Sequence, residues 1–136
     1  MNIQALLQWF DQLAPQSWAY QNLLGIDRWD SSWVPSRTGW TDVGTPTVTA
    51  RTRIIGRLCE AQVKVVPATS IATTAGTSYI ALPVTAAGLS GIGVMTNLTT
   101  NVAVGVCHVD VANSRVYVPT QAASGNTFTI FVSYEI

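Results

Sequence analysis

An antiparallel β-sandwich, preceded by a short helical segment, is the fold class that this sequence predicts. The strongest observation is the C-terminal stretch Thr127–Ile136, where large apolar residues occupy every second position and only Phe131 falls on the polar face. Such alternation is typical of a strand with one buried face, and we expect it to lie inside a sheet. From Trp40 onward, about eight strand-like segments also follow one another at ~10-residue spacing, separated by Gly, Pro, Asn and Ser. This spacing favours a jelly roll.

The first 39 residues differ from the rest and are predicted to form a separate attachment segment. Residues 2–13 place apolar side chains at helical spacing, and residues 17–24 could form a second helical piece that ends at Gly25. Both pieces are too short to be stable alone in water, so they must pack on the protein or on a partner.

All five tryptophans lie within the first 40 residues. Aromatic residues are enriched at the cores of protein interfaces. We therefore expect a docking surface that consists of Leu6, Trp9, Phe10, Trp18, Trp29 and Trp33. The alternative is that the indoles fill a collar between helices and sheet.

Residues 40–136 form the predicted β-domain. The expected strands are Trp40–Val48, Arg51–Arg57, Leu58–Val66, Thr77–Leu82, Gly91–Leu98, Val102–Asp110, Arg115–Val118 and the C-terminal stretch. In Leu58–Val66 the residues predicted to point inward are Cys59, Ala61, Val63 and Val65. Residues 67–78 and 82–90 are predicted to be surface loops, and Asn113-Ser114 and residues 124–126 to be hairpin-type turns.

The low charge content predicts that the chain assembles with copies of itself. Only 10% of the residues are charged, against a typical ~25%, and other copies would cover the apolar surface that remains. Phe131, Val104 and Val106 are the predicted subunit contacts. The strand that holds the two valines is apolar or small on both faces, as expected of a strand buried on two sides. The zero net charge lacks the basic patch that nucleic-acid binding needs. No apolar run approaches ~20 residues, so membrane insertion is not expected, and no secretory signal is visible.

Few side chains suggest chemistry, and no catalytic residue, metal or cofactor is predicted. His108 and Asp110 share a strand face, but His108 is the only histidine and a metal site usually needs more ligands. Several acidic residues occupy turn, cap or outward strand positions, and the sequence shows no recognisable glycosidase pair. Cys59 and Cys107 could form a disulfide, but a chain without an export signal favours two buried thiols.

Two groups of side chains are candidates for binding. Arg51 and Arg53 share a strand face, and Arg57 follows a glycine that would bend the chain. These arginines could bind an anionic ligand or a neighbouring subunit's carboxylates, or else form a charged strand edge that resists aggregation. Tyr79 and Tyr117 could stack against sugars on an exposed face, or be ordinary strand residues.

Short motifs follow one another through the β-domain: Trp40–Thr49, Gly56-Arg57, Gly76–Pro83, Gly91–Val94 and Ser133–Glu135. Their order resembles that in the C-terminal β-domains of bacteriophage tail fibres and related virion proteins. The resemblance implies a trimeric sandwich that serves host attachment or virion decoration, anchored to other virion proteins through residues 1–39 and assembled in the host cytoplasm. In such a head Tyr79 and Tyr117 would face the receptor, which could be a host-surface glycan. Because no long shaft separates anchor from head, it implies a short fibre, adaptor, plug or capsid-bound spike.

Three functions remain as hypotheses. The first is a homotrimeric virion protein, the second a small carbohydrate-binding, lectin-like module, and the third a hydrolase whose carboxylates meet only in space. The low charge and the missing export signal favour the first.

Overall fold

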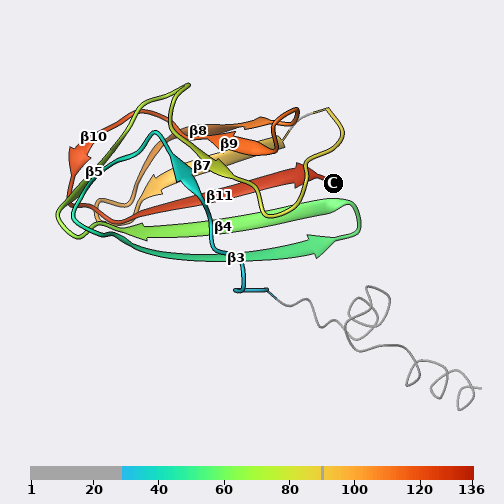
Figure 1. Ribbon diagram of the computed structural model, residues 1–136, viewed down its shortest axis with the longest axis horizontal. Coiled ribbons are helices and arrows are strands. Elements are labelled where there is room, and N and C mark those ends of the chain that lie inside the picture. The colour runs from blue at the N-terminus through green and yellow to red at the C-terminus, as the bar shows by residue number, and fades with distance from the viewer. Residues whose placement is uncertain (1–28, 90) are drawn as a thin grey trace, which may run out of the picture.

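The computed structural model describes residues 29–89 and 91–136. These residues fold into two antiparallel β-sheets and the loops that connect their strands (Figure 1). The strand order in the large sheet is β1 (Arg37–Thr38), β6 (Tyr79–Ala81), β9 (Arg115–Tyr117), β8 (Val102–Asp110), β7 (Gly91–Asn97), β11 (Phe128–Glu135), β4 (Leu58–Val66) and β3 (Thr47–Ile55). The order in the small sheet is β10 (Gln121–Ser124), β5 (Ser70–Thr73) and β2 (Thr41–Val43). The prediction of a mainly β, antiparallel fold is confirmed.

The C-terminal strand β11 lies inside the large sheet, between β7 and β4 (Figure 1). It pairs with β4 over its whole length, from Phe128 opposite Val65 to Glu135 opposite Leu58. Its inward side chains, at most 1% exposed, are Phe128, Ile130, Val132 and Tyr134. The strand alternation and the position inside a sheet are both as predicted.

One hydrophobic core joins the two sheets. Ile71 of β5 is fully buried together with inward residues of the large sheet such as Val65 and Ile130. The inward residues predicted for β4 are confirmed, since none is more than 3% exposed: Cys59, Ala61, Val63 and Val65. Each fully buried Val, Ile or Phe side chain contributes about 1.5–3 kcal/mol to folding. This burial holds the small sheet against one face of the large sheet.

A tyrosine and two cysteines place polar groups in the core. Cys59 and Cys107 are free and buried, as the sequence favoured. Burial raises the pKa of both thiols, that of Cys107 to about 12. The Tyr134 hydroxyl donates to the Val84 carbonyl at 2.9 Å and accepts from the Val84 N–H at 3.2 Å, so its hydrogen-bonding capacity is satisfied.

The predicted strand Trp40–Val48 is wrong, because the chain changes sheets within it. The stretch forms β2 in the small sheet and then enters β3 in the large sheet. Between these strands Gly44 has a positive φ of 81°, and Pro46 has no N–H to offer a ladder. The predicted strand Arg51–Arg57 is the second half of β3, which ends before the turn at Gly56.

Two further strands, β5 and β10, are not among the strands that the sequence predicts. The predicted loop 67–78 contains β5, whose Ile71 and Thr73 are buried. Residues 124–126 connect β10 of the small sheet to β11 of the large sheet, so they do not close a hairpin. The turn at Asn113-Ser114 is confirmed, since it joins the paired strands β8 and β9. β5 contains one large apolar residue and β10 contains none. β5 pairs with β10 on one side and with β2 on the other.

The β-sheet structure begins before Trp40. Asp30 and Thr52 form two backbone hydrogen bonds, of 2.7 and 2.8 Å, at the outer edge of β3. β1 pairs with β6, and Trp33 packs against the core. The predicted helices at 2–13 and 17–24 lie outside the described residues. Among the described residues, no helix has the length and apolar character that crossing a membrane requires.

Candidate functional site

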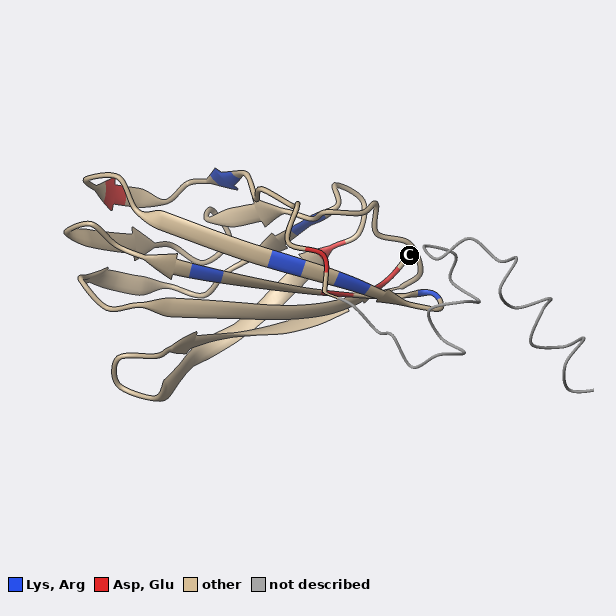
Figure 2. Cartoon of the chain, turned by 90° about the horizontal axis from the view of Figure 1, so that it is seen from below, with Lys and Arg blue, Asp and Glu red and all other residues tan. Residues whose placement is uncertain are grey.

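The outer face of the large sheet, opposite the core, brings the candidate side chains together. Strand register places five residues in one row that crosses β3, β4, β11, β7 and β8: Arg51, Gln62, Phe131, Val94 and Val106. Side chains directly opposite each other in such pairs have Cβ atoms about 5 Å apart, so neighbours in the row touch. Charged positions are few, and long stretches of strand carry none (Figure 2). The row joins a polar half of the face to an apolar half.

The apolar patch consists of Ile92, Val94, Val106 and Phe131. Ile92 and Val106 are 66% and 69% exposed, Val94 is 38% exposed, and Phe131 is half-buried. The predicted subunit contacts Phe131 and Val106 therefore share one face, with Val94 between them. A contiguous exposed apolar surface is typical of a site that binds another molecule.

Val104, the third predicted contact, lies apart from this patch. The register of β7 and β8 shifts between Met95 and Thr96, so the alternation of β8 is interrupted there. Val104 is half-buried and packs against the core. The expectation that β8 is buried on both faces is wrong for the single chain, because Val106 is largely exposed.

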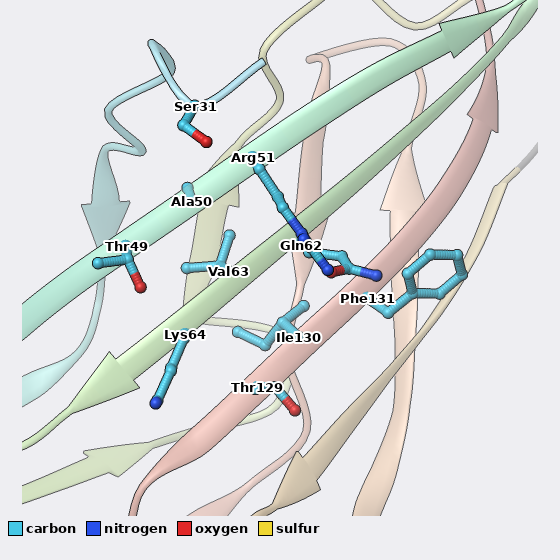
Figure 3. A pocket seen from close by; sticks show the side chains of 10 residues that line it. All are labelled: Ser31, Thr49, Ala50, Arg51, Gln62, Val63, Lys64, Thr129, Ile130 and Phe131. Carbon is cyan, nitrogen blue, oxygen red and sulfur yellow. The ribbon is translucent and has the colours of Figure 1, made fainter. Parts of the chain in front are cut away.

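A groove of about 460 Å³ lies beside the apolar patch, across β3, β4 and β11 (Figure 3). Its side chains form two rows across these strands: Thr49, Lys64 and Thr129, then Arg51, Gln62 and Phe131. Residues between them turn their side chains to the core and line the groove with main chain: Ala50, Val63 and Ile130. Ser31 completes the lining.

Arg51 extends from β3 across β4 toward Phe131 (Figure 3). Its Nε donates to Oε1 of Gln62 at 2.8 Å, and its guanidinium carbon lies 4.5 Å from the centroid of the Trp29 ring. Arg53 contacts the same ring at 4.7 Å and pairs with Glu60. The two arginines share a strand face as predicted, but only Arg51 lines the groove.

Tyr79 and Tyr117 form a second cluster on the outer face, over β6 and β9. Their rings meet edge to face, with centroids 5.6 Å apart and an interplanar angle of 72°. The Arg115 guanidinium lies 4.7 Å from the Tyr79 ring centroid and 5.0 Å from that of Tyr117, and its Nε donates to Asp110 at 2.9 Å. A hydrogen bond with Thr38, and then one with Arg115, lowers the pKa of Tyr79. The cluster presents aromatic surface beside a fixed cation.

His108 and Asp110 are the pair that the sequence raised as possible metal ligands. His108 is exposed and lies opposite Ile92. Asp110 accepts hydrogen bonds from Asn113 and Arg115. Both bonds lower the pKa of Asp110, and the bond from Asn113 has the larger effect. Within residues 29–89 and 91–136, no three His, Cys, Asp or Glu side chains gather where they could hold a metal ion.

Each aspartate and glutamate among the described residues has a partner. Asp30 accepts hydrogen bonds from Ser32. The others form ion pairs: Asp42 with Arg37, Glu60 with Arg53, Asp110 with Arg115 and Glu135 with Arg57. Each acid therefore has a structural contact that accounts for its position.

The predicted docking residues fall into two groups. Leu6, Trp9, Phe10 and Trp18 lie outside the described residues. Trp29 is half-buried over two arginines of β3, and Trp33 is half-buried against the core. The helical side of the predicted collar lies outside the described residues, so neither the docking surface nor the collar is tested.

The groove is the feature that the sequence reasoning missed. The two-residue turn Gly56-Arg57 sets Arg51 opposite Gln62, so this half of the site could have been aligned from the hairpin. No local signal places Phe131 beside Gln62, because β4 and β11 are distant in sequence.

A scan against protein-family models, a search of curated proteins and a search of solved structures each found no match.

Proposed function

We propose that this chain is a bacteriophage virion protein that forms a homotrimer through the outer face of its large sheet. The β-domain projects from the particle as a short fibre or spike in host attachment or decoration, and the N-terminal segment docks on other virion proteins. The apolar patch is the observation that carries self-assembly. The order of motifs from Trp40 onward supports the assignment to a virus particle.

The surroundings of the apolar patch resemble the anatomy of a protein interface. Polar neighbours in the strand register surround the apolar centre: Thr96, His108, Thr129 and Ser133. Interfaces have this arrangement of an apolar core within a polar rim. A second copy of the chain is the occupant that fits, because the patch is uncharged and the chain as a whole has no net charge to attract a charged partner.

The strand pairing supports a jelly roll for the β-domain. β4 pairs with β11 in the large sheet, and their neighbours in sequence, β5 and β10, pair in the small sheet. The arm β4–β5 and the arm β10–β11 therefore pass together from one sheet to the other. Paired arms of this kind are the outer turns of a jelly roll.

A lectin-like, carbohydrate-binding module is the alternative function. The cluster of Tyr79, Tyr117 and Arg115 favours it, because aromatic rings beside a fixed donor suit a sugar. This alternative does not require self-assembly, so the mass of the chain in solution separates the two.

Light scattering on the full-length chain tests the proposal. A trimer that persists on dilution supports the virion subunit, and a stable monomer that binds neutral sugars replaces it with the lectin. Deleting residues 1–28 tests the anchor while keeping the Asp30–Thr52 bridge. The deletion should abolish incorporation into particles and leave the β-domain folded. Unchanged incorporation would contradict the docking role.

A further inference from the structure

The cations that lack an acidic partner in the described chain both line the groove. Four arginines each lie within ion-pair distance of a carboxylate: Arg37, Arg53, Arg57 and Arg115. Arg51 contacts the uncharged side chains of Gln62 and Trp29, and Lys64 forms no ion pair with any described residue. Among residues 29–89 and 91–136, no carboxylate pairs with the positive charge at the groove, which favours an anionic ligand.

Neutral hydrogen-bonding groups surround these two cations. Thr49 and Thr129 lie directly opposite Lys64 on the two flanking strands. Their hydroxyls can each donate one hydrogen bond and accept others. Gln62 uses Oε1 to accept from Arg51, so its amide nitrogen remains as a donor. A ligand here meets hydroxyl and amide groups on both sides of the positive charge.

Phe131 places an aromatic ring at one edge of the groove (Figure 3). The volume of about 460 Å³ lies within the range of small-molecule sites, which combine an apolar surface with a few placed polar groups. Nucleic acid is a poorer fit, because binding driven by phosphates needs many more cations than two.

We propose that this groove binds an acidic saccharide, a sugar that carries a carboxylate or a sulfate. The anionic group lies between Lys64 and Arg51, the ring packs its apolar face against Phe131, and hydroxyls bond to Thr49 and Thr129. The groove lies on the β3 side of Phe131 and the exposed Ile92, Val94 and Val106 lie on the other side. Phe131 and Thr129 border both surfaces, and the remaining groove residues lie outside the apolar patch. The groove is present in the single chain, so saccharide binding does not require the proposed self-assembly.

Calorimetric titration of the full-length chain tests this site. The probes are trigalacturonic acid and a chondroitin sulfate hexasaccharide, with maltotriose as the neutral control and sodium sulfate as the free anion. At least one acidic oligosaccharide should bind at least tenfold more tightly than maltotriose and free sulfate, because a hydrogen bond to a charged group has about this effect. Added salt should weaken the binding.

Lys64→Gln should weaken binding of the acidic probe by roughly tenfold while leaving the assembly mass unchanged. The matched control is Arg57→Gln, which removes a cation whose side chain is 79% exposed and lies outside the groove; it should leave binding unchanged. Equal binding of maltotriose, equal effects of the two variants, or no binding of either acidic probe at millimolar concentration would overturn the proposal.

Discussion

Replacing the two most exposed residues of the apolar patch should dissociate the assembly without unfolding the chain. Ile92 and Val106 are 66% and 69% exposed in the single chain, so about two thirds of each side chain remains to be buried by a neighbour. Full burial is worth about 1.5–3 kcal/mol per side chain, which leaves about 1–2 kcal/mol for each in the assembly. The double variant Ile92→Ser/Val106→Ser should therefore lose about 2–4 kcal/mol per copy and raise the dissociation constant about 30- to 1,000-fold.

Light scattering across a dilution series measures this dissociation, and urea unfolding under conditions where the chain is monomeric measures stability. The free energy of unfolding should change by no more than about 0.5 kcal/mol per substitution, because neither side chain belongs to the core. Val43→Ser is the matched control, since Val43 is 50% exposed on β2 of the small sheet. A double variant that keeps the wild-type mass at every concentration would refute the reasoning, as would equal dissociation by the control.

Three further predictions concern single residues. Phe131→Ser should dissociate the assembly more than it lowers the free energy of unfolding, because Phe131 is only half-buried; equal losses in light scattering and urea unfolding would contradict this. Gly39 and Gly76 both have a φ of +74°. A Cβ added to Gly39 would lie 2.6 Å from the Thr77 carbonyl oxygen, whereas a Cβ added to Gly76 would have no neighbour within 4 Å. Gly39→Ala should therefore lower the melting temperature more than Gly76→Ala, which has only the backbone cost of about 1–2 kcal/mol; equal shifts would show that the close contact is relieved. Folding raises the pKa of Cys107 from 9.0 to about 12. Between pH 9 and pH 12 the thiol therefore loses its proton in the unfolded state but keeps it in the folded state. The free energy of unfolding should fall as the pH rises above 9. Urea titrations at about pH 8 and pH 10 should show a smaller fall for Cys107→Ala, and an equal fall would assign the effect to other groups.

The strands with strong alternation could be predicted from the sequence. Leu58–Val66 and the C-terminal strand carry large side chains at every second position, and each folds with that face in the core. In contrast, β5 and β10 have little alternation of their own, with at most one large apolar residue each. Their extended conformation depends on contacts between distant segments, which local pattern does not encode.

The sequence likewise predicts only part of the candidate site. Outward positions on β3 and β4 follow from alternation and from the turn between them, so the charges of the groove could be placed on one face. Phe131 joins that face, and Val94 and Val106 extend it, only because β11 inserts between β4 and β7. The bulge that turns Val104 toward the core also has no signal in its apolar surroundings.

The mass of the purified full-length protein by native mass spectrometry is the most direct test of self-assembly. The proposed trimer predicts a species of three times the 14.6 kDa chain mass that persists at micromolar concentration. A single species of 14.6 kDa at every concentration would contradict the assignment of the outer face as a subunit interface.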